Sequence, residues 1–496
     1  MSQEENLLKK SGILLLFACF TLASLSESTV AAASFVFAGI IVAISLQMSF
    51  YILFVLSVPF VMVVQWPILI TITVSDLLLP AVCFVLVRNY RRRADKNLRL
   101  ILTKPIIWIG LLFLAIIFSA FQESIDWVEY SLAIAKIAVA LLGGLAAIGI
   151  VYESKNDSQA LLGLLRAWVL TSFGVAVLGV LAYLALIFGV QSGFMYQSAR
   201  LQGTFDNPNA YAAYGLISLA FALIYNVRHH GGFNSLYTYT IFASLVLTNS
   251  RASQVAEIVL LTLGFILLVR TRREFTSWIL FAVPSAMMLF FLLPLINVII
   301  GLFAPAPLEA PDLLEEPNVV EDPNVVEDPN VLEEPNVLEQ PNVLDPIAAN
   351  PIQPRASISE DSRFTIWSVA LNFWSASPLW GRGFGQFISI SRTEQAGTPQ
   401  LVHNSFLSFL VETGVLGAFI FAYAFVFLAF LLLRAKTLTC RVLAIALAAS
   451  CVMMLSNNLE NARSLWIFMG ATYAWVVAST SPKPISSTYS SGNNSV

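Results

Sequence analysis

The chain has 496 residues, of which 57% are hydrophobic and only 11% are charged, with a net charge of -3 at pH 7. This composition excludes a soluble globular protein and predicts a polytopic membrane protein. The small negative charge argues against a nucleic-acid partner, because a phosphate backbone requires a strong positive patch. All four cysteines lie in apolar segments, so neither a disulfide framework nor a metal site is indicated.

Apolar segments near or above the length that a bilayer requires follow one another along most of the chain. Fourteen are found, near 12–26, 29–47, 50–66, 68–88, 105–121, 131–152, 161–188, 209–227, 234–249, 252–269, 276–300, 404–433, 438–456 and 464–480. The first three are short and could be fewer, longer elements. We therefore predict an all-α membrane protein with about 12–14 transmembrane helices.

Lysine and arginine are distributed unequally over the two sides that these spans define. With a cytoplasmic N-terminus, 19 of the 27 basic residues fall on the inner side, seven fall on the outer side, and Lys136 lies within a span. This asymmetry predicts that both termini are cytoplasmic. All seven outward cations are arginines, whose planar fork fits phosphate oxygens, although chance and snorkelling at helix ends could account for several of them.

A long polar segment at about 301–403 interrupts the apolar pattern and divides the chain. We expect a bundle of about eleven helices in 1–300, about three helices in 404–480 and a disordered cytoplasmic tail in 481–496. The polar segment is expected to face outward as one large extracytoplasmic loop.

This loop has two parts. Residues 316–345 repeat Pro-Asn-Val with acidic residues every six positions, which favours an extended, solvated spacer. The second part, 359–403, is predicted to be ordered. It contains an apolar and polar alternation of helical period with three tryptophans nearby, typical of a helix on the membrane surface, and then a glycine-rich turn at 378–385.

Three predicted helices begin on the outer side with capping residues next to a basic side chain. These groups are Arg200 with Asn207, Pro208 and Asn209; Asn249 and Ser250 with Arg251; and His403 with Asn404 and Ser405. A helix N-terminus beside an arginine is a ready anion site. The shared ligand that we infer is a phosphate or pyrophosphate.

His403 is one of three histidines and the candidate general base. A helix N-terminus disfavours the charged imidazole, and a general base must be neutral. Helical rotation of about 100° per residue brings Leu407, Gly414 and Gly417 near the face of His403, which predicts a glycine-lined groove below it. The alternative is a simple helix end, with the glycines allowing close helix packing. Glu412 falls on the opposite face and is not assigned as the partner of the histidine.

Other chemistry is not indicated by the sequence. It has no Gly-rich phosphate loop with its lysine, no His or Cys spacing for zinc, and no local Ser-His-Asp motif. We therefore expect neither a metal nor a cofactor.

These residues resemble a known family. His403-Asn404, nine residues and then Gly414-Val415-Leu416-Gly417 are similar to the His-Asn-x9-Gly-x-x-Gly signature of the bacterial O-antigen ligase/polymerase family. Other segments resemble the two arginine positions and the outer-loop segment of that family. They are Arg200 with 203–209, Ser250-Arg251, Arg363 to Trp367, and Pro378 to Gly385. The resemblance covers roughly residues 195–425.

The resemblance implies a membrane glycosyltransferase with a fold similar to GT-C-like enzymes. Such an enzyme transfers glycan from undecaprenyl diphosphate to an acceptor hydroxyl, on a lipid A-core sugar or a growing polysaccharide, without metal or nucleotide and with inversion. It implies that His403 activates the acceptor and that Arg200 and Arg251 hold the diphosphate. We place Arg363 with these arginines, and Asn207, Asn209, Asn404, Gly414 and Gly417 in supporting roles. The expected location is the bacterial inner membrane, with the active site facing the periplasm.

Two departures from the family pattern leave ligase and polymerase open. Fourteen segments exceed the twelve spans usual for ligases, and the acidic repeat is no part of the pattern.

The main alternative is a transporter or flippase for a lipid-linked glycan or small anion. A transporter built from repeats should show related halves and polar residues at the midplane, whereas the candidate residues here gather at the outer helix ends. A structural membrane protein ranks third.

Overall fold

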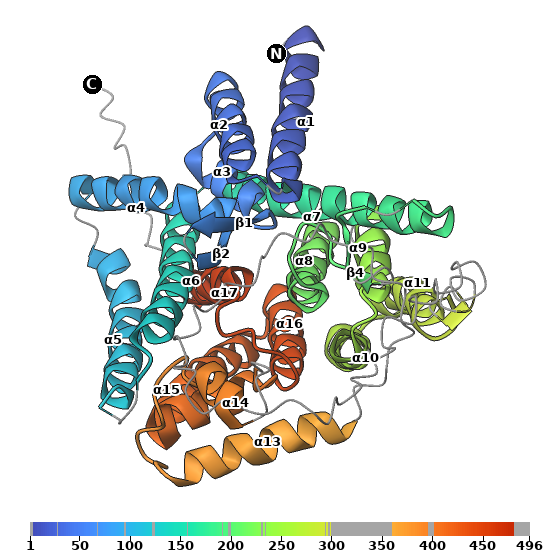
Figure 1. Cartoon of the computed structure of the whole chain (residues 1–496). Helices are drawn as coiled ribbons and strands as arrows, with labels where there is room; N and C mark the ends of the chain where they lie inside the picture. Colours follow the sequence, from blue (N-terminus) through green and yellow to red (C-terminus); the bar gives the residue numbers. More distant parts are fainter. Residues whose placement is uncertain are drawn as a thin grey trace, which may run out of the picture.

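The structure is a computed structural model. It describes residues 3–480 except 27, 67, 94–95, 122–124, 156, 191, 197–199, 230–231, 234, 293, 296–297, 299–359 and 395–400. The acidic repeat at 316–345 and the tail at 481–496 thus lie outside the described residues. Within the described part, helices dominate and the strands form only two small hairpins (Figure 1).

The elements before the long loop are α1 (Gln3–Leu25), α2 (Thr29–Ser45), α3 (Phe50–Ser57), β1 (Val61–Trp66), β2 (Ile68–Thr73), α4 (Val74–Arg93), α5 (Lys96–Ser119), α6 (Trp127–Ser154), α7 (Ser158–Ile187), β3 (Met195–Tyr196), β4 (Arg200–Leu201), α8 (Pro208–His229), α9 (Leu236–Leu247), α10 (Arg251–Leu268), α11 (Arg272–Met287) and the π-helix η1 (Met288–Leu292). The elements after it are α13 (Glu360–Ser375), α14 (Phe387–Glu394), α15 (Ser405–Ala435), α16 (Leu438–Met454) and α17 (Arg463–Thr480).

Among the described residues, seven helices are long and apolar enough to cross a membrane, and four shorter apolar helices accompany them. All eleven coincide with predicted apolar segments, as α17 also does. The protein is an all-α polytopic membrane protein, as the composition predicted.

The predicted spans near 50–66 and 68–88 are not continuous helices, and this part of the prediction is wrong. Helix α3 ends at Ser57, and β1 pairs antiparallel with β2, with Val61 opposite Thr73, before α4 begins. The strands are rich in β-branched Val, Ile and Thr, which favour extended backbone. Length and apolarity alone do not distinguish such a hairpin from a helix.

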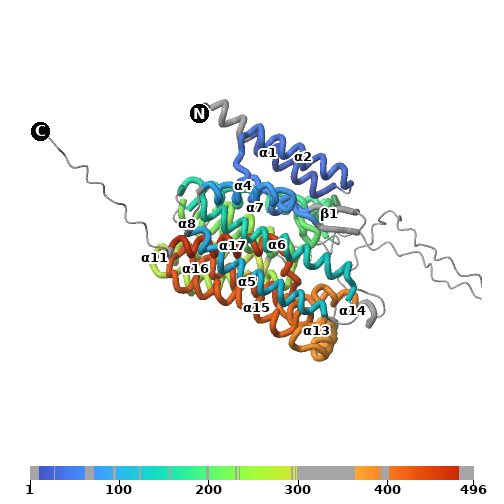
Figure 2. The backbone as a smooth tube through the Cα atoms, turned by 90° about the vertical axis from the view of Figure 1, so that its left-hand side faces the viewer, coloured from blue at the N-terminus to red at the C-terminus, as the bar shows by residue number. Residues whose placement is uncertain are grey.

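Helices α1 and α2 form an antiparallel pair in which Phe20 lies against Gly39. Figure 2 shows this pair on one side of the molecule, with α13 and α14 on the opposite side. The loop helices α13 and α14 therefore lie far from the N-terminal pair.

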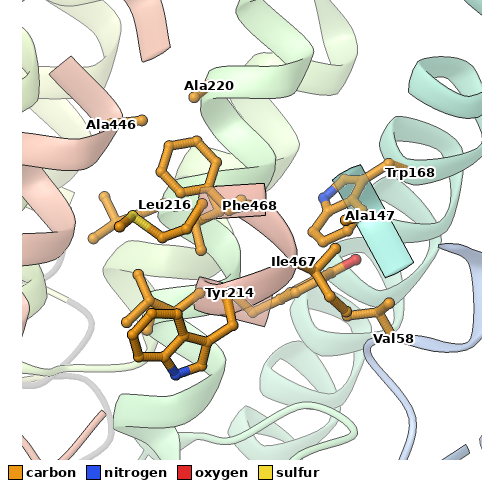
Figure 3. Packing of buried hydrophobic residues seen from close by; sticks show 14 of the residues in the cluster. Val58, Ala147, Trp168, Tyr214, Leu216, Ala220, Ala446, Ile467 and Phe468 are labelled. Atoms are coloured by element: carbon orange, nitrogen blue, oxygen red, sulfur yellow. The ribbon is translucent and has the colours of Figure 1, made fainter. Parts of the chain in front are cut away.

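The core is centred on α17, which lies between α6 and α8. Figure 3 shows Ile467 and Phe468 of α17 among side chains of these neighbours, including Ala147 and Tyr214. Close approach of α6 and α17 depends on glycine: a Cβ at Gly144 would lie 2.9 Å from the Trp466 carbonyl oxygen. Backbone atoms cannot move aside as a flexible side chain can.

Contacts between helix ends show that α8, α10 and α15 begin at one end of the bundle. The turn between α16 and α17 packs on the start of α15. Far from that turn, Arg228 near the end of α8 lies 4.6 Å over the Trp475 ring near the end of α17. Likewise, Arg441 near the start of α16 donates to the Leu267 carbonyl near the end of α10 over 3.3 Å. We call the end where α8, α10 and α15 begin the histidine end.

The α6–α17 contact gives a stability prediction. Gly144→Ala should lower the melting temperature in detergent, because overpacking against backbone costs about 1–3 kcal/mol. Gly163→Ala is the matched control, since a Cβ at Gly163 would meet nothing within 4 Å. The control should be neutral or slightly stabilising, because alanine favours helix. Equal melting temperatures for the two variants would contradict this packing.

Candidate active site

His403 stands at the mouth of α15 in a left-handed backbone conformation, with φ +54°. The next residue, Asn404, caps the helix: its side-chain oxygen accepts the backbone N–H groups of Phe406 and Leu407, each over 3.1 Å. The tight turn at His403 places its half-buried imidazole beside the capped helix end rather than in its first turn. The predicted cap at Asn404 is confirmed.

Helix α13 holds this mouth from the side. The Trp367 indole N–H donates to the Val402 carbonyl over 2.9 Å. Ile366, Val402 and Val411 pack with Phe387 of α14 in a small apolar cluster separate from the main core. Arg363 lies one turn before Trp367 on α13 and interacts electrostatically with His403.

The environment of His403 favours the neutral imidazole. Burial lowers the pKa of His403 below its usual value, and the positive charge of Arg363 lowers it further. Both effects favour the uncharged imidazole, which is the state that a general base requires.

The predicted glycine-lined groove below His403 is not present, because α15 is broken at Gly414. This residue has φ +69° and ψ -173°, so the helical rotation that aligned Gly414 and Gly417 with His403 does not continue through it. The space beside Gly414 is already filled, since a Cβ there would clash with the Leu379 carbonyl oxygen. At Gly417, a Cβ would instead meet Thr413 of the same helix.

The glycine-rich turn at 378–385 occupies that break. The Val415 N–H donates to the Pro378 carbonyl over 2.9 Å, and the Arg382 N–H donates to the Val411 carbonyl over 3.0 Å. Gly381 must be a glycine, because it has φ +76° and a Cβ would clash with the backbone of Glu412. The backbone groups that the broken helix leaves free are thus paired with the outer loop.

A second polar cluster joins the starts of α8 and α10. The Arg200 guanidinium donates to the Asn209 side-chain oxygen over 3.1 Å and to the Thr248 carbonyl over 3.2 Å. Ser250 donates to the same Asn209 oxygen over 2.8 Å, and Arg251 is exposed beside it at the first position of α10. Two of the predicted helix mouths are therefore in direct contact.

Both caps in this cluster are as predicted. Asn207 accepts the Asn209 N–H over 2.7 Å, and Ser250 accepts the Ser253 N–H over 3.4 Å. The site residues thus form two groups at the histidine end, Arg200 with Asn209 and Ser250, and His403 with Arg363. Within the described ranges, no group of three or more His, Cys, Asp or Glu side chains is placed to hold a metal ion.

The turn between α16 and α17 is a functional candidate that sequence reasoning missed. Asn457, Asn458 and Glu460 lie on it and form hydrogen bonds with the start of α15 or with one another. The available signal was a run of polar residues, Ser456 to Asn461, between two apolar segments.

Residues 236–422 match the family model described as O-antigen ligase. This match relates that part of the chain to the O-antigen ligase family. A comparison with curated proteins gives no match. The O-antigen ligase match includes Arg251, Arg363 and His403 and begins after Arg200, which approaches the matched region through Thr248. The family resemblance predicted from the sequence is confirmed.

The His403–Arg363 pair, which lies within the matched residues, gives a pH prediction. Arg363→Gln removes a positive charge and should raise the pKa of His403 toward its usual value. Any activity that needs neutral His403 should then begin to fall at higher pH as the solution is acidified. Titration of the His403 ring signal by NMR measures the shift directly, with Arg363→Lys as the charge-retaining control. An unchanged pKa in Arg363→Gln would contradict the interaction.

Proposed function

We propose that this protein transfers glycan from an undecaprenyl diphosphate carrier to an acceptor hydroxyl, at the outer face of the bacterial inner membrane. The observation that carries the proposal is a half-buried His403 beside the start of α15, at the same end of the bundle as the Arg200 cluster. The O-antigen ligase match supports the reaction class. In the topology that we propose, both termini are cytoplasmic and the histidine end faces the periplasm.

In the proposed reaction, His403 takes the proton of the acceptor hydroxyl as its oxygen attacks the anomeric carbon of the donor. The bond between that carbon and the diphosphate oxygen breaks, and its electron pair stays on the diphosphate. Attack from the side opposite the leaving group inverts the anomeric centre. Because a diphosphate is a good leaving group, the two carboxylates of a glycosidase are not required.

Arg200 and Arg251 are proposed to bind the departing diphosphate together with the N–H groups at the starts of α8 and α10. Helix N-termini and arginines stabilise an anion in the same way, by donors aimed at its oxygens. Asn209 fixes Arg200 and Ser250 relative to each other. Arg363 contributes positive charge beside the base. None of these steps calls on a metal or a cofactor.

His403→Ala should lower transfer by about 10²–10⁴-fold, the usual contribution of a general base. Transfer is measured with purified protein, an undecaprenyl-diphosphate-linked oligosaccharide and a glycolipid or glycan acceptor. The variant should retain the melting temperature of the wild type within a few degrees, since the cap at Asn404 remains. Transfer by His403→Ala at the wild-type rate would show that His403 is not the general base.

Arg200→Lys should lower transfer by at least about 10-fold. Lysine lacks the planar guanidinium that donates to both Asn209 and Thr248. A hydrogen bond to a charged group contributes about 1.5–3 kcal/mol. Arg166→Lys, far from the histidine end on α7, is the control. If Arg200→Lys were as active as the control, the proposal that the guanidinium of Arg200 is needed to bind the diphosphate would be wrong.

Deleting residues 316–345 should leave the rate of transfer nearly unchanged, because a solvated spacer contributes no group to the site and loop length affects stability only weakly. The same assay checks this. A large loss of transfer would show that the repeat takes part in the site. The identity of the product, a longer glycan or a glycan joined to lipid A-core, separates polymerase from ligase.

A further inference from the structure

A cleft of about 570 Å³ is enclosed by four neighbouring helices, α5, α6, α15 and α17 (Figure 1). Its floor is formed by α6 and α17, where Gly144 and Trp466 are buried. Its walls are formed by α5 and α15, which carry the exposed side chains of Ile107, Leu111 and Tyr423. The cleft therefore opens on the flank of the bundle. Because α5, α6 and α15 are long and apolar enough to cross a membrane, that flank faces lipid.

The walls of the cleft suit a hydrocarbon chain. Lys104 is the one charged residue among the side chains that line it. The Trp108 indole N–H is already used, since it donates to the Ile420 carbonyl over 2.6 Å. The Tyr473 hydroxyl likewise donates to the Ile101 carbonyl over 3.3 Å. Ordered water requires several polar partners, so this lining favours an apolar occupant.

Two positive charges lie at one end of the cleft. Lys104 Nζ lies 5.9 Å from the centre of the Phe427 ring, at the last turn of α15 that lines the cleft. Phe427, Phe430 and Arg434 have the spacing i, i+3 and i+7 and share one face of α15. The Arg434 guanidinium lies 6.0 Å over the Phe430 ring. Neither Lys104 nor Arg434 forms an ion pair with a described carboxylate, so both charges are available to an anion.

This charged end is far from the histidine end. Phe427 comes 22 residues after Ser405 in α15, which corresponds to about 30 Å along the helix. Helix α5 also ends at the histidine end, where Ser119 accepts the Phe384 N–H over 3.2 Å, and Lys104 lies near its other end. A separation of about 30 Å is the thickness of the hydrocarbon core of a bilayer. A diphosphate bound at the histidine end therefore cannot reach Lys104.

We propose that the cleft between α5, α6, α15 and α17 binds an anionic glycerophospholipid of the inner leaflet, with an acyl chain in the cleft and the phosphate at Lys104 and Arg434. The cytoplasmic leaflet is the anionic one, and basic pockets between transmembrane helices on that side bind anionic head groups. The leaflet rests on the topology in the proposed function, whereas binding of the lipid does not. The prenyl chain of the carrier fits less well, because its diphosphate belongs at the opposite end.

The head group is tested with the full chain, stripped of lipid in detergent and titrated with phosphatidylglycerol or with phosphatidylcholine of the same acyl chains. Native mass spectrometry counts the bound lipid. One phosphatidylglycerol should bind at least about fivefold more tightly than phosphatidylcholine, because each basic residue near a lipid phosphate contributes roughly that factor. Equal affinities for the two lipids would contradict a phosphate site.

Lys104→Gln should weaken phosphatidylglycerol binding by roughly fivefold and leave phosphatidylcholine binding unchanged. Arg273→Gln is the matched control for the loss of one positive charge, since Arg273 is exposed at the start of α11, across the bundle from α5 (Figure 1). The control should bind phosphatidylglycerol as the wild type does. If both variants lose affinity to the same extent, Lys104 has no specific role and the charge effect is a general one.

Ala424→Phe places a ring in the cleft, which Ala424 lines, and should abolish the specific binding of either lipid. Val426→Phe on the same helix is the control, because Val426 is 67% exposed and outside the lining. Wild-type affinity in Ala424→Phe would show that the lipid binds elsewhere. Melting temperatures of the two variants, measured without lipid, check that both are folded.

A phosphatidylglycerol with a photoreactive acyl chain locates the site directly, and decides the case even if Ala424→Phe fails to fold. Labelled peptides should come from 419–428 and 466–473, whereas labels confined to other helices would refute the site. If undecaprenyl phosphate displaces the probe at equal concentration, the cleft belongs to the carrier instead. None of these measurements requires glycan transfer, so the lipid site and the proposed function can fail separately.

Discussion

The arrangement at the histidine end depends on the contact between the glycine-rich turn and the broken helix α15. A helix interrupted at membrane depth exposes backbone groups that lipid cannot satisfy. Here the turn supplies hydrogen-bond partners for these groups: the Pro378 carbonyl accepts the Val415 N–H, and the Arg382 N–H donates to the Val411 carbonyl. Because this contact fixes the turn and α14 against α15, it also fixes the small apolar cluster that supports Val402 and, next to it, His403.

The same constraint explains why glycine is needed at two facing positions. Gly381 and Gly414 lie on opposite sides of the contact, and a side chain at either would strike backbone of the other segment. Both also have positive φ, which L-residues rarely adopt. These glycines permit the loop to pack against the break in α15. The residues around His403 are contacted instead by α13, through Trp367 and Arg363.

Much of this site could be predicted from residue types and spacing. The caps at Asn207, Ser250 and Asn404 are local, because they depend on a few consecutive residues, and they formed as expected. The shared side of the three helix mouths followed from counting apolar segments and basic residues. The contact of Arg200 with Asn209 and Ser250, and the approach of Arg363 to His403, depend on tertiary packing. The sequence predicts that these residues lie at one end of the bundle, but it does not predict the distances between them.

The failures have physical causes as well. A period of 100° per residue predicts a face only while the helix is continuous, so it failed at Gly414. The hairpin of β1 and β2 is as apolar as a transmembrane span, so a prediction from length and apolarity assigned helix to these residues. The α16–α17 turn was overlooked because its contact with the start of α15 forms only on folding, as Ser405 bonds Asn457, which lies 52 residues later in the chain. Long-range pairs of this kind leave no local pattern.

The most direct test is the reaction of purified wild-type protein in detergent with an undecaprenyl-diphosphate-linked oligosaccharide and an acceptor, reading both the released carrier and the anomeric configuration of the new bond. We expect one undecaprenyl diphosphate to be released per glycan transferred, with inversion at the anomeric carbon. Retention would contradict direct attack by the acceptor and indicate a covalent intermediate. No transfer, together with movement of the carrier across liposome bilayers, would identify a transporter instead.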